Sequence, residues 1–260
     1  VAETENQARA LEQALKAAGL TEVECFVAMR YWHPRASAVI GQVKSCNPAH
    51  LVLLPLYPQF STTTTQSSLE EWRRLAKSAG LAVETHEVGG FPGDPGFVGG
   101  YAELIRAAAP DYFGPAASKP ARLLFSAHGL PQRIVDAGDP YPGQVAVSAS
   151  AIASALGLAP RQWEIGYQSR VGPLKWIGPS TEERIGNAGA EKIPLVVAPI
   201  AFVSEHSETL VELDIEYKQL AARYGVPDYI RVPAVGTHPV FIQGLAGLVI
   251  TALSGIQARN

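Results

Sequence analysis

The sequence predicts an α/β protein with parallel sheets, and three observations support this fold class. Short apolar runs alternate with helix-like stretches along the whole chain, as in successive βαβ units. The 260 residues are 47% hydrophobic and 17% charged, which suits a globular core and is too apolar for a disordered chain. Polar and aromatic residues follow several of the apolar runs directly, where parallel sheets place their ligand sites.

Each expected strand is a short apolar run bounded by turn residues, and each expected helix repeats apolar residues three or four positions apart. The expected strands are Val23–Met29, Leu51–Leu54, Ala82–Glu87, Leu123–Ser126, Glu164–Tyr167, Pro194–Ile200 and Tyr229–Val232. The expected helices are Glu5–Ala18, Ala36–Lys44, Gln66–Ser78, Val98–Ala109, Gln144–Leu156, Thr181–Asn187, Glu205–Tyr224 and Pro239–Ile250. Helices of this length between strands imply sheets covered on both faces.

The chain is long enough for two doubly wound domains. The stretch Ala109–Pro120 is rich in Pro, Ala and Ser, and it is the expected linker between them. We therefore predict an N-terminal domain over residues 1–118 and a C-terminal domain over residues 119–234. The helix within residues 235–260 is expected to pack back on the first domain.

Composition argues against several function classes. The net charge is −3 and no block of Lys and Arg occurs, so nucleic-acid binding is not expected. No run of 18 apolar residues and no secretory signal pattern are visible. The two cysteines, Cys25 and Cys46, are too few and too far apart for a cluster or a thiolate zinc site. A cytoplasmic location is expected, with peripheral contact to a membrane surface left open.

Two segments carry most of the chemistry. Arg122–Pro131 (RLLFSAHGLP) is an apolar run that ends at His128 and passes into a turn. Pro199–Tyr217 (PIAFVSEHSETLVELDIEY) leads from a strand into a helix with glutamates at 205, 208, 212 and 216. At about 100° per residue these four carboxylates fall within an arc of ~80°. A histidine at one strand end and carboxylates at another suit a divalent cation site with a proton acceptor.

Ordinary structural roles remain open for both features. His128 could be a core histidine bonded to a backbone carbonyl. The acidic ribbon could be a solvated helix face, although glutamates repeated every four residues repel one another. Aromatic residues at the strand ends predict a cleft for a large, flat, apolar ligand. They are Tyr31, Trp32, Tyr57, Phe60, Trp176 and Phe202.

Several long motifs resemble the ferrochelatase family, which inserts ferrous iron into protoporphyrin IX to form protohaem with release of two protons. They are MRYWHP (29–34), LYPQFSTTTTQSS (56–68), FSAHGLP (125–131), GDPYP (138–142), YQSRVGPLKWIGP (167–179) and FVSEHSETLVELDIEY (202–217). They occur in the family's order and cover nearly the whole chain. The resemblance implies two Rossmann-like, chelatase-type domains with the active-site cleft between them.

The resemblance also implies roles for individual residues. His128 and Glu208 match the family's iron-site and catalytic pair, and His128 is the proposed acceptor of the pyrrole protons. The other three glutamates, Glu205, Glu212 and Glu216, match positions thought to pass metal or protons along the helix. Porphyrin-binding positions are matched by Arg30, Tyr31, Trp176 and Phe202, and Tyr57 joins them as an aromatic residue of the expected cleft.

The implied ligands are protoporphyrin IX and Fe²⁺, with iron as substrate and no prosthetic group. Thr62 stands where cluster-bearing relatives have a cysteine, so no 2Fe–2S cluster is expected. Family members begin with a further strand and helices, so one or two βαβ units are expected to precede Val1. A monomer is favoured. Three alternatives stay open: a non-catalytic porphyrin- or haem-binding protein, a coproporphyrin-specific ferrochelatase, and a two-domain solute receptor.

Overall fold

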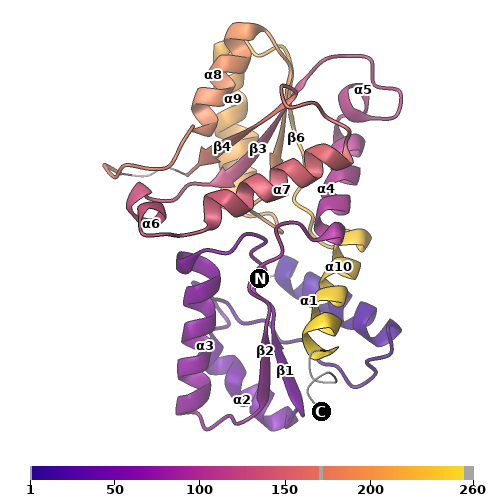
Figure 1. Ribbon diagram of the computed structural model, residues 1–260, viewed down its shortest axis with the longest axis vertical. Coiled ribbons are helices and arrows are strands. Elements are labelled where there is room, and N and C mark those ends of the chain that lie inside the picture. Colours follow the sequence, from indigo (N-terminus) through magenta and orange to yellow (C-terminus); the bar gives the residue numbers. More distant parts are fainter. Residues whose placement is uncertain (1, 170–171, 255–260) are drawn as a thin grey trace. The chain divides into compact units, whose positions relative to one another are not determined.

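Contacts divide the chain into two α/β units. A computed structural model describes residues 2–169 and 172–254 (Figure 1). The second unit runs from Pro92 to Gly236, and the first contains the segments on either side of it. Both units have parallel sheets, as the sequence predicts.

The first unit is a short parallel sheet between two pairs of helices (Figure 1). Its elements are α1 (Ala2–Ala17), α2 (Ala36–Cys46), β1 (His50–Leu53), the π-helix η1 (Thr62–Gln66), α3 (Ser67–Ser78), β2 (Glu84–Glu87) and α10 (Pro239–Ser254). Leu51 and Leu53 of β1 pack against an apolar cluster on α2 and α3 that includes Trp72. On the other side, α10 lies against α1 and the strands.

The second unit is built on a parallel sheet with the strand order β4-β3-β5-β6. Its elements are α4 (Pro95–Ala108), α5 (Pro110–Phe113), β3 (Arg122–His128), α6 (Gln132–Asp136), α7 (Tyr141–Ala155), β4 (Trp163–Gln168), α8 (Thr181–Glu191), β5 (Leu195–Pro199), the π-helix η2 (Glu208–Glu216), α9 (Tyr217–Tyr224) and β6 (Tyr229–Arg231). Strands β3 and β5 are almost entirely buried, as central strands of a sheet covered on both faces should be.

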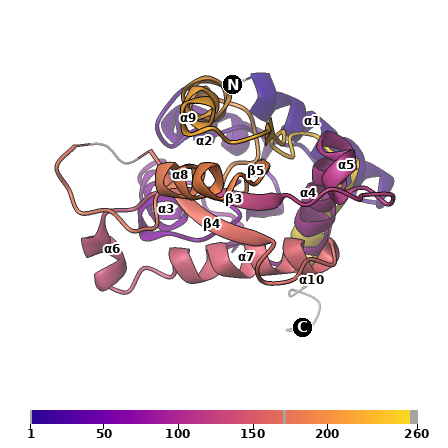
Figure 2. The same cartoon turned by 90° about the horizontal axis from the view of Figure 1, so that it is seen from above.

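Helices cover both faces of this sheet, with α8 and α9 on one side and α7 on the other (Figure 2). Leu124 and Val197 point from the strands into a buried cluster with Ile185 of α8 and Leu213 of η2. This packing fixes where η2 begins relative to the ends of β3 and β4, and it therefore positions the glutamates that η2 carries.

The close approach of α8 and α9 depends on Gly189. A Cβ at this position would lie 2.9 Å from the carbonyl carbon of Tyr224 and would also strike its carbonyl oxygen. We predict that Gly189→Ala destabilises the protein by about 2 kcal/mol, because backbone must move to relieve the clash. The melting temperature should fall by roughly 4–8 °C.

Gly186→Ala is the matched control on the same helix. Its added Cβ would meet the Tyr224 ring at 3.7 Å, an ordinary contact. Alanine also favours helix over glycine by about 1 kcal/mol, so this variant should be as stable as the parent or more so. Equal melting temperatures for the two variants would contradict the assigned role of Gly189.

The structure corrects three expectations about elements. Val23–Met29 forms no strand, since only Met29 pairs, through an isolated bridge to Arg35. The expected helix 205–224 begins at residue 207 and continues as η2 and α9, so Glu205 lies outside it. Two short helices, α5 and α6, occur where none was predicted.

The compact units also separate elsewhere than the boundary expected after residue 118. The units divide after Phe91 and after Gly236, so α4 and α5 belong with the second unit. The Pro-rich stretch expected as a linker contains α5, and within the second unit the Tyr112 hydroxyl of α5 donates to Asp228 Oδ2 at 3.0 Å.

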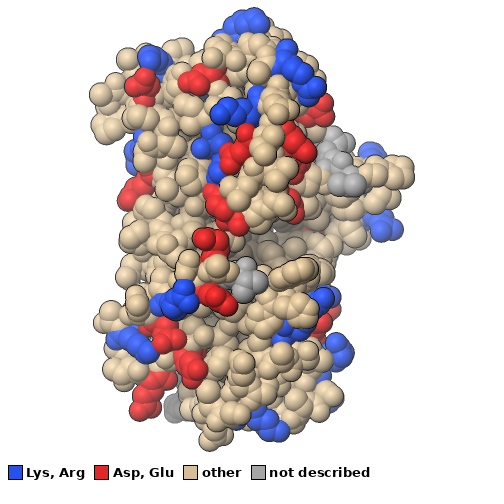
Figure 3. Space-filling view, turned by 180° about the vertical axis from the view of Figure 1, so that it is seen from behind, with Lys and Arg blue, Asp and Glu red and all other residues tan. Residues whose placement is uncertain are grey.

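Two features of the described structure concern membrane spanning and surface charge. No helix in the described part of the chain is long and apolar enough to cross a membrane. On the face shown in Figure 3, Lys and Arg are interspersed with Asp and Glu, without a continuous basic region.

Candidate functional site

The candidate site lies at the carboxyl ends of β3 and β4 in the second unit. These strands are parallel, and the last pair of their ladder is His128 opposite Gln168. The segment that follows β5 continues into η2, whose first residue is Glu208. The alternation of strand and helix predicted this edge as the ligand site.

His128 and Glu208 form the central contact of this site. The His128 Nδ1 lies 2.7 Å from Glu208 Oε2. The side chains are 40% and 37% exposed, so a substrate can reach both. The hydrogen bond from His128, acting against burial, lowers the pKa of Glu208, so the carboxylate is ionised at neutral pH. Facing an ionised carboxylate, Nδ1 must be the donor, which leaves Nε2 of the neutral ring as a proton acceptor.

Glu212 is held by four hydrogen bonds. Oε1 accepts from the amide of Ser169 at 2.8 Å and from the Tyr217 hydroxyl at 2.9 Å. Oε2 accepts from Gln168 Nε2 at 3.0 Å and from the Ser169 hydroxyl at 2.6 Å. A carboxylate has about four acceptor positions, so in this arrangement Glu212 offers none to a cation. It anchors the end of β4 to η2.

Ser169 has a backbone conformation that non-glycine residues seldom adopt. Its φ is +59°, in the left-handed region. This conformation aims both its amide and its hydroxyl at Glu212. Strained backbone of this kind persists where the surroundings fix it, and it is common at functional sites.

A cavity of about 900 Å³ opens beside these residues. Its lining combines carboxylates with apolar side chains. The described lining residues are His128, Tyr167, Ser169, Gly172, Leu174, Trp176, Ser180, Glu182, Ser207, Glu208, Val211, Glu212, Glu216 and Tyr217. The volume is in the range of small-molecule sites.

Two of the predicted aromatic residues lie at this site. Trp176 lines the cavity and is positioned by an isolated bridge to Pro131, just after β3. The Phe202 ring packs edge-on against His128, with 6.3 Å between centroids, and against His206, at 4.4 Å. Burial lowers the pKa of His206, whose Nδ1 accepts a hydrogen bond from the amide of Glu208.

Glu205 does not lie with the other glutamates. It pairs with Arg231 and accepts a hydrogen bond from the amide of Ala234 at 2.9 Å. Arg231 also binds Asp214, through its Nε at 2.7 Å. Burial opposes the arginine's charge, but the hydrogen bonds to Asp214 and Glu205 outweigh it and raise the pKa of Arg231. The expected ribbon of four carboxylates is therefore a ribbon of three.

The remaining predicted residues belong to the first unit. Arg30 donates to the Ser67 hydroxyl at 2.8 Å, and its guanidinium lies 4.8 Å from the centroid of the Tyr31 ring. The hydroxyl of Tyr31 donates to the carbonyl of Thr63, yet the side chain is 61% exposed. Burial raises the pKa of Tyr57. Arg30 also forms an ion pair with Glu71, with 3.4 Å between Nη1 and Oε2.

Sequence reasoning assigned no role to Ser169, Gln168 or Tyr217, which hold Glu212. Gln168 and Ser169 directly follow the expected strand Glu164–Tyr167, and that position is the one sequence signal that points to them. Of the motif residues, Arg170 and Val171 lie outside the described residues.

Comparison with known proteins identifies the family. A family model described as Ferrochelatase matches residues 1–253. The chain belongs to the ferrochelatase family. Ferrochelatases insert iron into a porphyrin in haem biosynthesis, so the chain is an iron-inserting lyase of that process. The resemblance recognised in the motifs is thus confirmed.

Curated ferrochelatases match most of the chain. The ferrochelatase of Caulobacter vibrioides is 52% identical over 250 residues, covering 95% of this chain and 70% of the relative. That of Phenylobacterium zucineum is 52% identical over 254 residues, covering 96% and 71%. That of Pelagibacter ubique is 45% identical over 245 residues, covering 94% and 70%.

Solved structures support the fold class. A structure of SirB from Bacillus subtilis with Fe³⁺ aligns with a TM-score of 0.69 at 16% identity, covering 99% of this chain and 93% of that one. A structure of CbiX, a terminal enzyme of sirohaem biosynthesis in denitrifying bacteria, gives 0.57 at 18% identity, covering 95% and 92%. They confirm the predicted chelatase-type α/β fold with parallel sheets flanked by helices.

Proposed function

We propose that this ferrochelatase acts on protoporphyrin IX, with His128 and Glu208 as its iron site and His128 as the acceptor of the pyrrole protons. The observation that carries the proposal is the 2.7 Å contact between His128 and Glu208 at the wall of a cavity. An imidazole nitrogen and a carboxylate oxygen are ligands that suit Fe²⁺.

Metal insertion removes two N–H protons from the porphyrin. With Nδ1 donating to Glu208, a neutral His128 ring can accept one proton at a time at Nε2, and the ionised Glu208 would stabilise the imidazolium that results. The first proton would pass on to solvent or to the carboxylates of η2 before the second is taken. A cation held nearby also makes loss of the pyrrole protons easier. The same pair can therefore serve metal delivery and proton removal in succession.

The proposed path for iron or protons follows η2. Glu216 is exposed at the end of η2 and lines the cavity together with Glu212 and Glu208. Because all acceptor positions of Glu212 are used, a cation that binds there must displace a donor such as the Ser169 hydroxyl. Glu205 is left out of this path because Arg231 neutralises it.

Aromatic and apolar side chains suit the faces of a porphyrin ring. We propose Arg30, Tyr31, Tyr57, Trp176 and Phe202 as the residues that bind it. A ring bound against rigid aromatic walls can be held in a distorted, non-planar form. Binding energy would then offset part of the distortion that metallation requires.

Charge in the cavity supports protoporphyrin IX over coproporphyrin. The described lining residues include four carboxylates, Glu182, Glu208, Glu212 and Glu216. Leu174 and Val211 add exposed apolar surface, at 48% and 45%. A dicarboxylate with apolar substituents meets less repulsion here than a tetracarboxylate.

A metallation assay with both porphyrins tests the proposal. Purified chain, anaerobic Fe²⁺ and either porphyrin are mixed, and the loss of free porphyrin is followed by absorbance. We expect enzyme-dependent conversion with a higher kcat/KM for protoporphyrin IX. A higher value for coproporphyrin would contradict the specificity. Binding of porphyrin without conversion, repeated with a chain extended at its N-terminus, would contradict the catalytic assignment in favour of a non-catalytic porphyrin-binding protein.

A further inference from the structure

A second cluster of metal-binding side chains lies on the sheet of the first unit. His50 of β1 is the register partner of Glu84 of β2, and Val52 is the partner of His86. Successive side chains of a strand point to opposite faces, so Glu84 and His86 share a face, and register places His50 on it. Leu51 and Leu53 occupy the other face, against α2 and α3.

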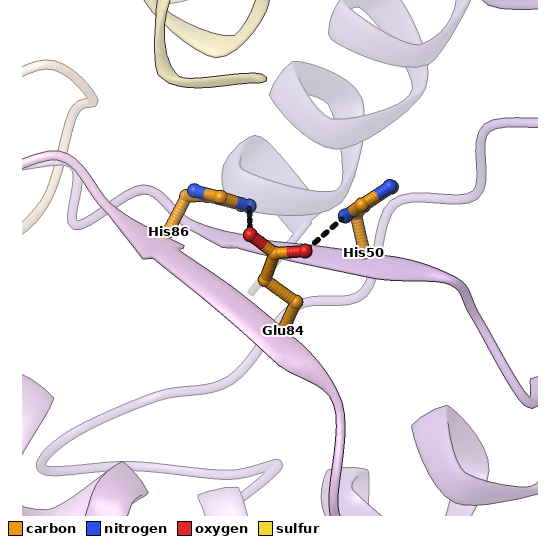
Figure 4. Close-up of side chains that lie close together, drawn as sticks. All are labelled: His50, Glu84 and His86. Carbon is orange, nitrogen blue, oxygen red and sulfur yellow. Dashed lines mark ion pairs between the residues drawn. The ribbon is translucent and has the colours of Figure 1, made fainter. Parts of the chain in front are cut away.

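The three side chains converge on one point (Figure 4). The Glu84 carboxylate lies between the two rings, with Oε2 3.3 Å from His50 Nδ1 and Oε1 3.7 Å from His86 Nε2. Each residue offers one ligand atom, and these three atoms all lie within 4.8 Å of one another. Neither ring turns away from the carboxylate.

Burial distinguishes this cluster from an exposed acidic patch. The His86 Nε2 atom is buried and has no hydrogen-bond partner among the described residues. Native structures seldom leave such an atom unpaired, and an ion is one of the things that can satisfy it. His50 and Glu84 are 39% and 55% exposed, so an ion can enter from solvent and keep a water ligand.

We propose that His50, Glu84 and His86 form a binding site for a divalent first-row transition metal ion such as Zn²⁺. Two imidazoles and one carboxylate, completed by water, are a ligand set that zinc accepts in tetrahedral geometry. Magnesium and calcium prefer oxygen ligands throughout and suit this site poorly. Donor atoms around zinc sit roughly 3.4 Å apart, so shifts of about 1 Å would complete the site.

This site is separate from the proposed iron site. It lies in the first unit and includes the first residue of each strand, whereas in the second unit His128 is the last residue of β3 and Glu208 the first residue of η2. A sheet of only two strands gains little stability from its own pairing. A metal ion bonded to both strands would clamp β1 to β2, and its role is therefore structural.

Zinc binding is tested in the His128→Ala/Glu208→Gln double variant, which lacks the proposed iron site. Equilibrium dialysis against Zn²⁺ should give about one bound ion per chain. Adding His86→Ala or Glu84→Gln should weaken that binding at least tenfold. The matched control is Glu87→Gln, a glutamate of the same strand on the opposite face, where it pairs with Arg73. Its affinity should be unchanged.

A second readout guards against misfolding of the variants. Zinc should raise the melting temperature of the double variant and of its Glu87→Gln derivative, but not that of the Glu84→Gln derivative. Glu84 is exposed enough for its replacement to leave the fold intact. Absence of bound zinc in the double variant, or equal affinity in the Glu84→Gln and Glu87→Gln derivatives, would overturn the site. Neither result depends on porphyrin chemistry.

Discussion

Replacing His128 with alanine is expected to slow porphyrin metallation by about 10²- to 10⁴-fold, the usual contribution of a positioned acid–base group. The variant loses the Nε2 proton acceptor and one of the two proposed iron ligands. Porphyrin binding should survive, because the aromatic groups proposed to hold the ring are untouched. Fluorescence quenching on porphyrin binding and the absorbance assay measure the two quantities separately.

Glu208→Gln should cause a loss of similar size. Glutamine keeps the shape of the side chain but removes the charge that orients His128 and stabilises its protonated form. Glu183→Gln is the matched control, since Glu183 is exposed in the first turn of α8 and outside the described cavity lining. Unchanged turnover in His128→Ala would move the proton acceptor to another residue, and unchanged turnover in Glu208→Gln alone would move the iron site.

Arg231→Met is expected to destabilise the protein by about 3 kcal/mol without entering the chemistry. The substitution leaves Glu205 and Asp214 as two neighbouring carboxylates with no cation between them. Removing one partner of a buried pair costs roughly 3–5 kcal/mol, and we take the lower end because Asp214 is 34% exposed. Differential scanning calorimetry should show a melting temperature lower by roughly 6–12 °C.

A triple variant, Arg231→Met/Glu205→Gln/Asp214→Asn, separates charge from packing. If uncompensated charge is the cause, neutralising both carboxylates should recover most of the lost stability. A triple variant as unstable as Arg231→Met alone would show that the arginine acts through packing.

The sequence predicted elements best where pattern and burial coincide. The expected strand 123–126 lies within β3, and the expected strand 194–200 contains β5, because continuous apolar runs between helices form the central strands of a covered sheet. The strand predicted over Val23–Met29, which is also mostly apolar, was wrong, since a strand also needs a neighbour to pair with. Among the described residues, the β-pairing of this segment is limited to the isolated bridge between Met29 and Arg35.

Individual side chains of the site were predictable in part. Spacing predicted that all four glutamates lie together, and three of them do. Helix periodicity could not show that the helix starts after Glu205. The partner that takes Glu205 away is Arg231, 26 residues later in the chain. The contacts of Ser169 and Tyr217 with Glu212 likewise depend on how β4 meets η2, which no local pattern encodes.

The ladder between β3 and β4 has a consequence for mutation by insertion or deletion. The Ser126 hydroxyl donates to Gln168 Oε1 at 2.6 Å, and Gln168 Nε2 donates to the backbone carbonyl of Glu208. These hydrogen bonds connect the pairing of β3 and β4 to Glu208, the partner of His128. A shift of one residue in either strand reverses every side chain across the sheet. Adding or removing a single residue in β3 or β4 would therefore turn His128 or Gln168 away from Glu208, while leaving all of them in the sequence.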